Sequence, residues 1–380
     1  MTILPAAHVD EDTFTRLVTL ADYEREAAAR FLRHRRHELW DFIAGGAGSE
    51  ISLGRTPLAY QQIRLRPRAM ADVSQVDTGV QILGHRWPIP VGIAPTALHQ
   101  MCHPDGELAT VRAAGDLGVP MIVSTFASTT IEEILAATDP ARHPVYQQVY
   151  LFRQRSVTLD MARRAVEAGA AGLVVTVDSP WLGVRLRDRR NQLEMPAELR
   201  AANLAASLPE EPDISSPEAH SRDTMDPSAT WDDVAHLVEA VDVPVLAKGI
   251  LVAEDLKLAR DAGAAGVIVS AHGGRQLDRA LTPLEALPDI AAAAPEGYPI
   301  LLDGGIRSGT DVVIALALGA DAVLIGRPVL HGLTVAGPEG VRRVLHLLRE
   351  QLVNVMGLLG RRTVGEIDDS AIALPPPSAR

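Results

Sequence analysis

The chain has 380 residues, of which 47% are hydrophobic and 22% charged, with a formal net charge of −12 at pH 7. It can therefore bury a large core, but its acidic balance, with no lysine–arginine block, excludes a typical nucleic-acid or anionic-membrane binder. A single cysteine, Cys102, excludes an intrachain disulfide. Because no uncharged run reaches the length of a membrane span and the first residues lack the basic segment of a signal peptide, we expect a cytoplasmic protein.

The first part of the chain has the spacing of an amphipathic helix. In residues 12–43 apolar side chains recur three and four positions apart among charged ones, and the glycines of "AGGAGSE" then end the pattern. We expect residues 1–65 to form a helical extension that packs on the main body of the protein.

From residue 88, short apolar runs alternate with alanine-rich amphipathic stretches that end in glycine. There are eight such runs, namely "PIPVGIAPTA", "VPMIVSTF", "PVYQQVY", "AAGLVVTVD", "VPVLAKGI", "AAGVIVSAHGG", "YPILLDGGI" and "ADAVLIGRP". Runs that are apolar at nearly every position suit parallel strands buried on both faces. Eight β/α units predict an α/β fold, a (β/α)8 TIM barrel over residues 88–360, with a doubly wound sheet as the competing fold. The chain 1–380 then forms a single domain.

One long insertion interrupts this pattern between the fourth and fifth runs. Residues 190–230 are rich in proline, serine, aspartate and glutamate and carry no apolar stripe. A connection of this length inside a compact domain is commonly functional. We therefore expect a mobile loop or lid after the fourth strand.

Polar residues gather where the apolar runs end. The segments "DGGIRSG" and "GRP", after runs seven and eight, combine glycine backbone amides with Arg307 and Arg327, and barrels commonly bind phosphate at this place. Lys248 supplies a cation at the end of run five, and hydroxyl and amide side chains end other runs. Together these groups suit flavin mononucleotide (FMN), whose reduced ring a lysine would stabilise.

The stretch "VSAHGGRQLD" (269–278) brings a base, His272, a cation, Arg275, and two glycines to the end of run six. With "IAPTA", "HPDGE", "STFAS", "TVDSPWLGVRLRDRRN", "TWDDV", "AKGI", "LLDGGIRSG" and "GRP", it resembles the FMN-dependent L-2-hydroxy-acid oxidases and dehydrogenases. These stretches cover about residues 35–360 in the same order. Two further segments, "WDFIAGGAG" and "RLRPRAM", are most similar to the 4-hydroxymandelate oxidases within that family.

The resemblance implies a role for each residue at the strand ends. His272 would accept a proton from the substrate, and Arg275 would hold the substrate carboxylate. Tyr150 and Arg185 would make further substrate contacts, and Asp178 would pair with His272 and stabilise its protonated form. The residues around the FMN would be Pro95, Thr96, Ala97, Ser124, Gln148, Thr176, Lys248, Ser270, Asp303, Gly304, Gly305, Arg307, Gly326 and Arg327.

Three positions depart from the common pattern of the family. Phe42 stands where many members have a tyrosine that binds the substrate carboxylate, and Phe126 replaces a frequent tryptophan beside the substrate tail. Ala271 replaces the asparagine before the histidine, a change for which the sequence offers no interpretation. The two phenylalanines make the pocket more apolar and favour an aryl substrate, mandelate or 4-hydroxymandelate, with lactate or glycolate as the alternative.

The resemblance implies that a homotetramer oxidises an (S)-2-hydroxy acid to the 2-keto acid and passes the electrons to O2 or another acceptor. The residues alone leave two other classes open. A phosphate-binding aldolase or isomerase could use Lys248 as a Schiff-base lysine, and a non-catalytic FMN-binding protein would need no base. We expect no metal site, because His99, Cys102 and His103 lack a fourth ligand.

Overall fold

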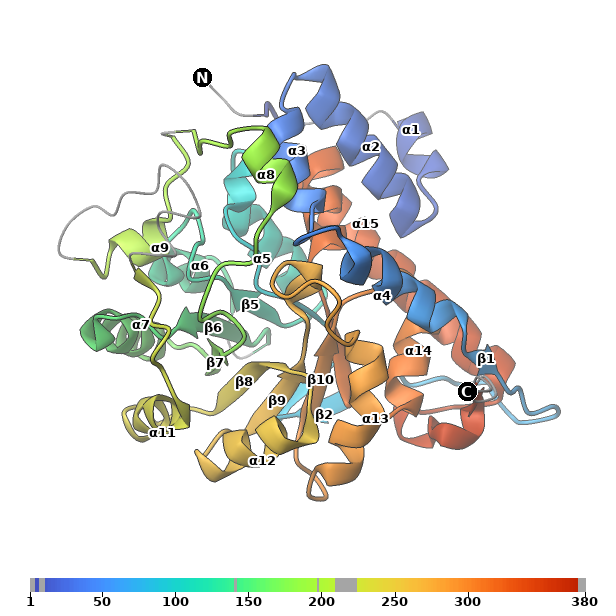
Figure 1. Ribbon diagram of the computed structural model, residues 1–380. Helices are drawn as coiled ribbons and strands as arrows, with labels where there is room; N and C mark the ends of the chain where they lie inside the picture. The colour runs from blue at the N-terminus through green and yellow to red at the C-terminus, as the bar shows by residue number, and fades with distance from the viewer. Residues whose placement is uncertain (1–3, 7–10, 140–141, 197, 209–223, 375–380) are drawn as a thin grey trace.

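The computed structural model describes residues 4–6, 11–139, 142–196, 198–208 and 224–374, and its centre is a closed barrel of eight parallel strands (Figure 1). Around the barrel each strand pairs with its neighbours in the chain, and β11 pairs with β4 to close the ring. The predicted (β/α)8 barrel is confirmed. Its strands are β4 (Val91–Ile93), β5 (Met121–Val123), β6 (Val145–Tyr150), β7 (Gly172–Thr176), β8 (Val245–Ile250), β9 (Gly266–Val269), β10 (Ile300–Asp303) and β11 (Ala322–Ile325).

A helix on the outside of the barrel follows each barrel strand. Three of these helices begin at capping boxes, in which a threonine and an acidic residue three positions later exchange hydrogen bonds, at Thr130 and Glu133, at Thr230 and Asp233, and at Thr282 and Glu285. The outer helices are α5 (Gly106–Asp116), α6 (Ile131–Ala136), α7 (Arg155–Glu167), α11 (Trp231–Glu239), α12 (Ala253–Asp261), α13 (Pro283–Ala293), α14 (Gly309–Ala317) and α15 (Arg327–Leu359).

The inside of the barrel is filled with side chains. Alternate strand residues point inward and form one buried cluster, and Trp87 belongs to it. This tryptophan comes from a hairpin of β2 (Val80–Ile82) and β3 (His85–Trp87), which precedes the first barrel strand and covers the end where the strands begin. A ligand site must therefore lie at the opposite end, where the strands finish.

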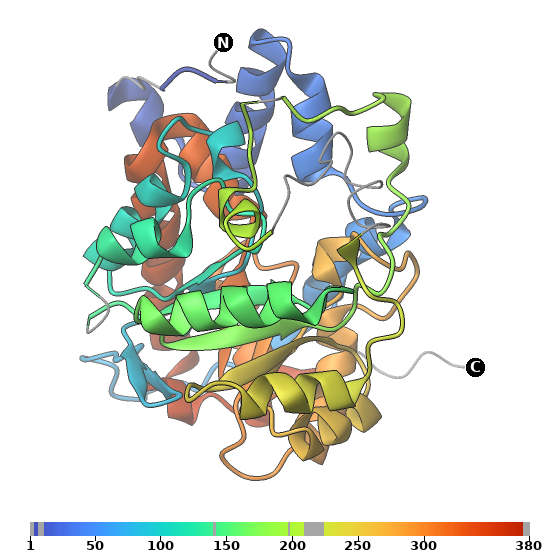
Figure 2. The same cartoon turned by 90° about the vertical axis from the view of Figure 1, so that its left-hand side faces the viewer.

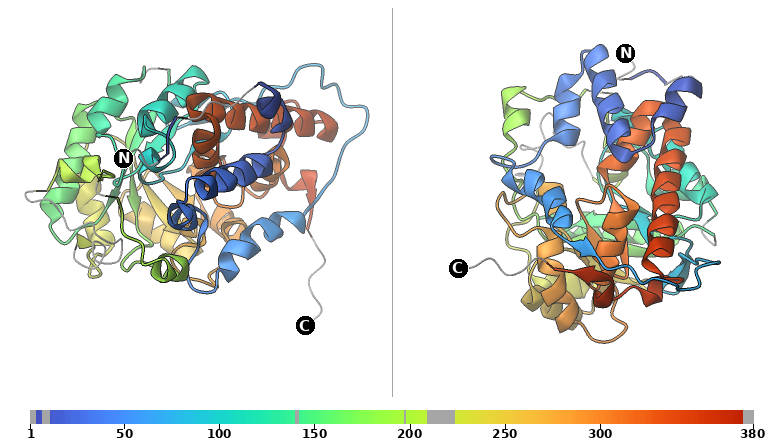
Figure 3. Two further views of the ribbon diagram at one scale, coloured as in Figure 1. Left: turned by 90° about the horizontal axis from the view of Figure 1, so that it is seen from above. Right: turned by 90° about the vertical axis from the view of Figure 1, so that its right-hand side faces the viewer.

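The N-terminal extension is helical, as predicted, but it is divided into several helices. The single pattern of residues 12–43 becomes α1 (Glu11–Arg16), α2 (Leu20–Arg33) and α3 (His37–Ala44), and α4 (Ile51–Gln61) follows. Arg35 adopts a left-handed φ of 55° and turns the chain between α2 and α3. The views in Figure 3 show α2 packed along α15, and Tyr23, Ala27 and Phe31 of α2 are buried.

The segment after α4 pairs with the last part of the described chain. β1 (Arg64–Leu65), which follows α4, pairs antiparallel with β12 (Ile372–Ala373). Among the described residues, no helix is long and apolar enough to cross a membrane.

The insertion after β7 contains two short helices, α8 (Leu186–Arg190) and α9 (Ala202–Ala205). Figure 2 shows α9 above α7. Part of the predicted lid, residue 197 and residues 209–223, lies outside the described residues. The mobility expected for residues 190–230 stays a prediction.

Candidate active site

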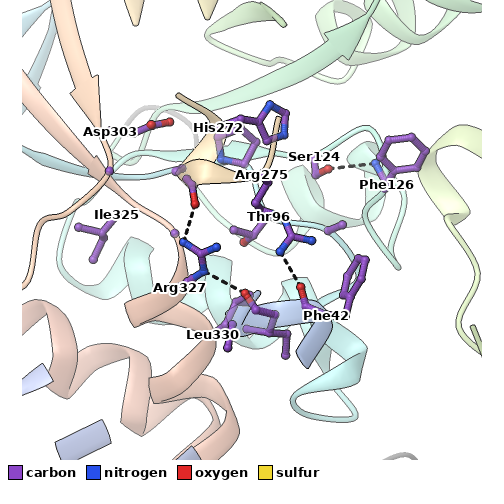
Figure 4. Close-up of a pocket in the computed structure, with 18 of the residues that line it drawn as sticks. Phe42, Thr96, Ser124, Phe126, His272, Arg275, Asp303, Ile325, Arg327 and Leu330 are labelled. Atoms are coloured by element: carbon purple, nitrogen blue, oxygen red, sulfur yellow. Dashed lines mark hydrogen bonds between the residues drawn. The ribbon is translucent and has the colours of Figure 1, made fainter. Parts of the chain in front are cut away.

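A cavity of about 790 Å³ lies at the ends of the barrel strands (Figure 4). All but two of the residues that the sequence assigned to the site line it, and the two others, Asp178 and Ser270, lie behind the lining. The predicted residues on its wall are Phe42, Pro95, Thr96, Ala97, Ser124, Phe126, Gln148, Tyr150, Thr176, Arg185, Lys248, His272, Arg275, Asp303, Gly304, Gly305, Arg307, Gly326 and Arg327.

His272 and Asp178 form a hydrogen-bonded pair at one side of the cavity. The two residues follow β9 and β7, and His272 Nδ1 lies 2.9 Å from Asp178 Oδ1. The backbone N–H of His272 donates to Ser270 Oγ at 3.0 Å, which fixes the start of the turn. Because Nδ1 is used by the carboxylate, Nε2 is the ring nitrogen that a ligand in the cavity can meet.

The charge of this pair is set by its surroundings. Burial raises the pKa of the Asp178 carboxyl, but the charge of His272, the hydrogen bond with it and the charge of Lys248 outweigh burial, so that this pKa lies below its usual value. Asp178 is therefore ionised at neutral pH. An ionised carboxylate at this distance would stabilise an imidazolium on His272.

Two arginines lie over the ring of Phe42. The guanidinium carbons of Arg275 and Arg185 are 5.0 and 5.7 Å from the centre of that ring. Nη1 of Arg275 donates to the carbonyls of Phe42 and Gly45 at 2.6 and 2.9 Å, at the C-terminal end of α3. Burial and then the nearby charge of Arg185 lower the pKa of Arg275 well below its usual value. A bound anion would favour the charged form of this arginine.

Aromatic side chains line the cavity next to these charges. The rings of Phe126 and Tyr150 lie 5.6 Å apart, centre to centre. Burial raises the pKa of the Tyr150 hydroxyl well above its usual value, so the phenol stays protonated and can donate a hydrogen bond.

Glycine backbone and two more arginines form another part of the cavity. Gly304 and Gly305 have φ of 97° and 84°, and a Cβ on Gly305 would lie 2.6 Å from the ring of Tyr60. Arg327 donates to the carbonyls of Ile43, Gly45 and Gly273 at 2.8–3.0 Å, as Figure 4 shows in part. Burial and the charge of Arg307 lower the pKa of Arg327 to about 10. Open backbone and paired cations of this kind suit a phosphate.

Lys248 lies between these two regions. Its Nζ is 3.1 Å from Asp303 Oδ2 and donates to Ser270 Oγ at 2.9 Å. Ser270 is fully buried and does not line the cavity, so in this structure it contacts Lys248 and the His272 backbone. Within the described part of the chain, Asp303 Oδ1 is a buried oxygen with no hydrogen-bond partner, which leaves it open to a bound molecule.

Among the residues at the site that sequence reasoning missed, two groups stand beside the predicted ones. Gln276 holds the chain beside the histidine, since its Nε2 donates to Asp178 O and Ser179 Oγ at 3.2 and 2.7 Å. The motif around His272 contained that glutamine and could have indicated it. The second group comes mainly from the insertion, where nothing in the pattern indicated a wall: Leu182, Met195, Leu199, Ala201 and Met225.

The cavity fits a flavin nucleotide on the observations above. Its volume lies in the upper part of the range of roughly 300–1,000 Å³ typical of small-molecule sites. The glycine–arginine region suits the phosphate, and the unpaired Asp303 oxygen together with Lys248 suits polar atoms of the ring or ribityl chain. His272 also lines this cavity, so a small acid bound beside the flavin could meet it.

Comparison with known proteins agrees with this fit. A family model described as FMN-dependent dehydrogenase matches residues 32–374. The chain belongs to this family. This family assignment excludes the alternative of a non-redox aldolase or isomerase. The protein is an FMN-dependent oxidoreductase of the 2-hydroxy-acid oxidase type.

Individual relatives cover almost the whole chain. A 4-hydroxymandelate oxidase of Amycolatopsis orientalis is 44% identical over 92% of this chain and 96% of its own length, and an L-lactate oxidase of a Nostoc species is 40% identical over 94% and 98%. A crystal structure of mandelate oxidase superposes with a TM-score of 0.85 at 43% identity, covering 94% of this chain and 98% of the other. The predicted resemblance is therefore confirmed.

The glycine turn of this FMN-dependent dehydrogenase gives a direct test of cofactor binding. Gly305→Ala places a methyl group against Tyr60 at a φ that L-residues avoid, so we expect the FMN dissociation constant of the apoprotein to rise by about 10- to 100-fold. Quenching of FMN fluorescence measures this constant. The matched control is Gly297→Ala, a positive-φ glycine with open space around it. Equal FMN binding by the two variants would contradict the assignment.

Proposed function

We propose that this enzyme oxidises an (S)-2-hydroxy acid with an aryl substituent, such as mandelate or 4-hydroxymandelate, to the 2-keto acid, with O2 as the final electron acceptor. The observation that carries the substrate class is the apolar wall beside the cationic pair. Phe126, Met195, Leu199 and Met225 line the same cavity as the two arginines, and Phe42 lies under both guanidiniums. An aryl ring gains free energy by leaving water for such a wall.

The proposed roles follow from the positions of the side chains. Arg275 and Arg185 bind the substrate carboxylate, and Tyr150 donates a hydrogen bond to the substrate oxygen. His272 accepts the proton at Nε2, and Asp178 stabilises the resulting imidazolium across the 2.9 Å contact. FMN supplies the acceptor for the two electrons that the substrate loses.

Cofactor binding is proposed for the polar and glycine residues on the cavity wall. Arg307, Arg327 and the Gly304–Gly305 turn hold the phosphate, and Lys248 stabilises negative charge on the reduced ring. Ser270 acts through Lys248. The other proposed contacts are Pro95, Thr96, Ala97, Ser124, Gln148, Thr176, Asp303 and Gly326.

A small aliphatic 2-hydroxy acid is the second candidate, supported by 40% identity to an L-lactate oxidase. Rates with (S)-mandelate, L-lactate and glycolate separate the two. Burial of the ring stabilises the aryl complex by about 1.5–3 kcal/mol, so kcat/KM for mandelate should exceed that for glycolate by roughly 10- to 150-fold. If lactate or glycolate equals mandelate, only the general 2-hydroxy-acid class survives.

Two extensions of this experiment make it sharper. Phe42→Tyr adds a hydroxyl next to Arg275 and should move the preference toward the small acids. Anaerobic reduction of the flavin followed by admission of air tests the acceptor, since rapid return of the oxidised spectrum identifies O2. A spectrum that stays reduced in air would indicate another acceptor.

We also propose that the whole chain acts as one unit and assembles as a homotetramer in the cytoplasm. Exposed apolar side chains support association, among them Trp181 at 65% and Leu277 at 73% exposure. These two residues are linked through Gln276, whose Nε2 donates to the carbonyl of Trp181. Light scattering on the eluted holoenzyme measures the assembly, and a monomeric mass would contradict it.

A further inference from the structure

Residues 198–208 of the insertion contribute to the wall of the cavity. Leu199 is fully buried and Ala201 nearly so, and both line the cavity. The helix α9 that follows them has only four residues and cannot hold this segment in place by itself. The position of this segment therefore depends on its contacts with the rest of the protein.

Asn203, in the middle of α9, makes that connection. It is a polar residue with 0% exposure, and its side chain uses both ends of the amide. Oδ1 accepts from the backbone N–H of Ile131 at 3.1 Å, at the first residue of α6. Nδ2 donates to the carbonyl of Ser124 at 3.3 Å and to Gln147 Oε1 at 3.0 Å.

These partners belong to the framework of the cavity. Ser124 and Phe126 line it, and the N–H of Phe126 donates to Ser124 Oγ at 3.1 Å. The backbone N–H of Asn203 also donates to Ala127 O at 3.4 Å. One side chain therefore joins the insertion to the loop after β5, to α6 and to β6. An apolar residue of the same size would leave buried donors and acceptors without partners.

We propose that Asn203 is a positioning residue for substrate selection, which holds Leu199 and Ala201 against the space occupied by the substituent of the 2-hydroxy acid. It touches neither the reacting atoms nor the cofactor. Its effect should therefore depend on the substrate. A substrate with an aryl tail uses the wall, whereas lactate and glycolate do not reach it. The inference rests on the proposed function.

The test compares kcat/KM for (S)-mandelate with that for L-lactate in Asn203→Ala and in Asn203→Asp. The aspartate keeps the acceptor for Ile131 but loses both N–H donors to Ser124 and Gln147. We expect the mandelate-to-lactate ratio to fall by about tenfold, as when a ring loses on the order of 50 Å² of apolar contact, mainly through KM. FMN affinity should stay within about threefold of that of the unchanged protein.

A binding measurement without turnover gives a second readout. Perturbation of the flavin spectrum by phenylacetate and by oxalate reports the affinity for a carboxylate with and without a ring, and only the first should weaken. The matched control is Ser207→Ala, which removes the contact of Arg164 with the chain just after α9, at 2.8 Å, without touching the loop after β5. The control should keep the ratio of the unchanged protein.

Failure of this inference differs from failure of the proposed function. If the unchanged holoenzyme oxidises no 2-hydroxy acid, the proposed function is wrong. If it does, and the ratio in the variant that retains FMN lies within twofold of the original, the role of Asn203 is wrong. Loss of FMN by both variants would also overturn it, because the amide would then support the cofactor rather than the wall.

Discussion

Replacing His272 with alanine is expected to slow the reduction of bound FMN by (S)-mandelate by about 10²–10⁴-fold. The variant loses Nε2, the ring nitrogen that we expect to meet the substrate, because Nδ1 already contacts Asp178 at 2.9 Å. Anaerobic stopped-flow absorbance measures the rate directly. FMN should remain bound, because the proposed phosphate contacts follow β10 and β11 and do not lie at the end of β9.

The control for this experiment is His37→Ala, since that side chain is 63% exposed on α3 and does not line the cavity. It should leave the rate unchanged. Reduction of the His272 variant at a rate within about tenfold of that of the unchanged enzyme would remove this histidine from the mechanism.

Replacing Arg275 with methionine should lower kcat/KM for (S)-mandelate by about 30- to 4,000-fold, which corresponds to roughly 2–5 kcal/mol for a buried charge pair that loses one partner. For Arg275→Lys, kcat/KM should lie between the values of the unchanged enzyme and of the methionine variant. The lysine should act mainly by raising KM. One ammonium cannot cap the carbonyls of Phe42 and Gly45 and also meet a carboxylate in two places. Steady-state kinetics and FMN binding measure both variants.

Arg342→Met serves as the control for the arginine variants, because this arginine pairs with Glu339 and Asp116 on the outside of the barrel. It should have normal kinetics. An unchanged KM for mandelate in Arg275→Lys would show that the substrate carboxylate binds elsewhere, with Arg185 as the next residue to test.

The sequence by itself determined the barrel and much of the site. Each buried strand and each capped helix can be predicted from a local pattern, because the periodicity of apolar side chains and the helix caps involve only a few neighbouring residues. In a barrel the strand ends must meet at one face, so the order of the runs alone assigns His272, Lys248 and Arg307 to one cavity. His272 and Arg275 are three positions apart in the sequence, so their proximity could be predicted from the sequence alone.

Only the tertiary structure decided which groups touch. Asp178 pairs with a histidine 94 residues away, and Arg275 caps a helix 230 residues before it. Ser270 turned out to lie behind Lys248, and the long helical pattern at the N-terminus is broken at Arg35. Such contacts depend on the direction of each side chain and on packing between distant elements, which no local period records.

The insertion gives the clearest example of this limit. Its composition predicted a loop, yet Leu199, Ala201 and Met225 line the cavity. The sequence showed no apolar stripe there, because the segment packs through separate buried residues and is joined to the barrel loops by hydrogen bonds, as at Asn203, rather than by a repeated face. A buried amide satisfied by three distant partners becomes visible only when the folded chain brings those partners together.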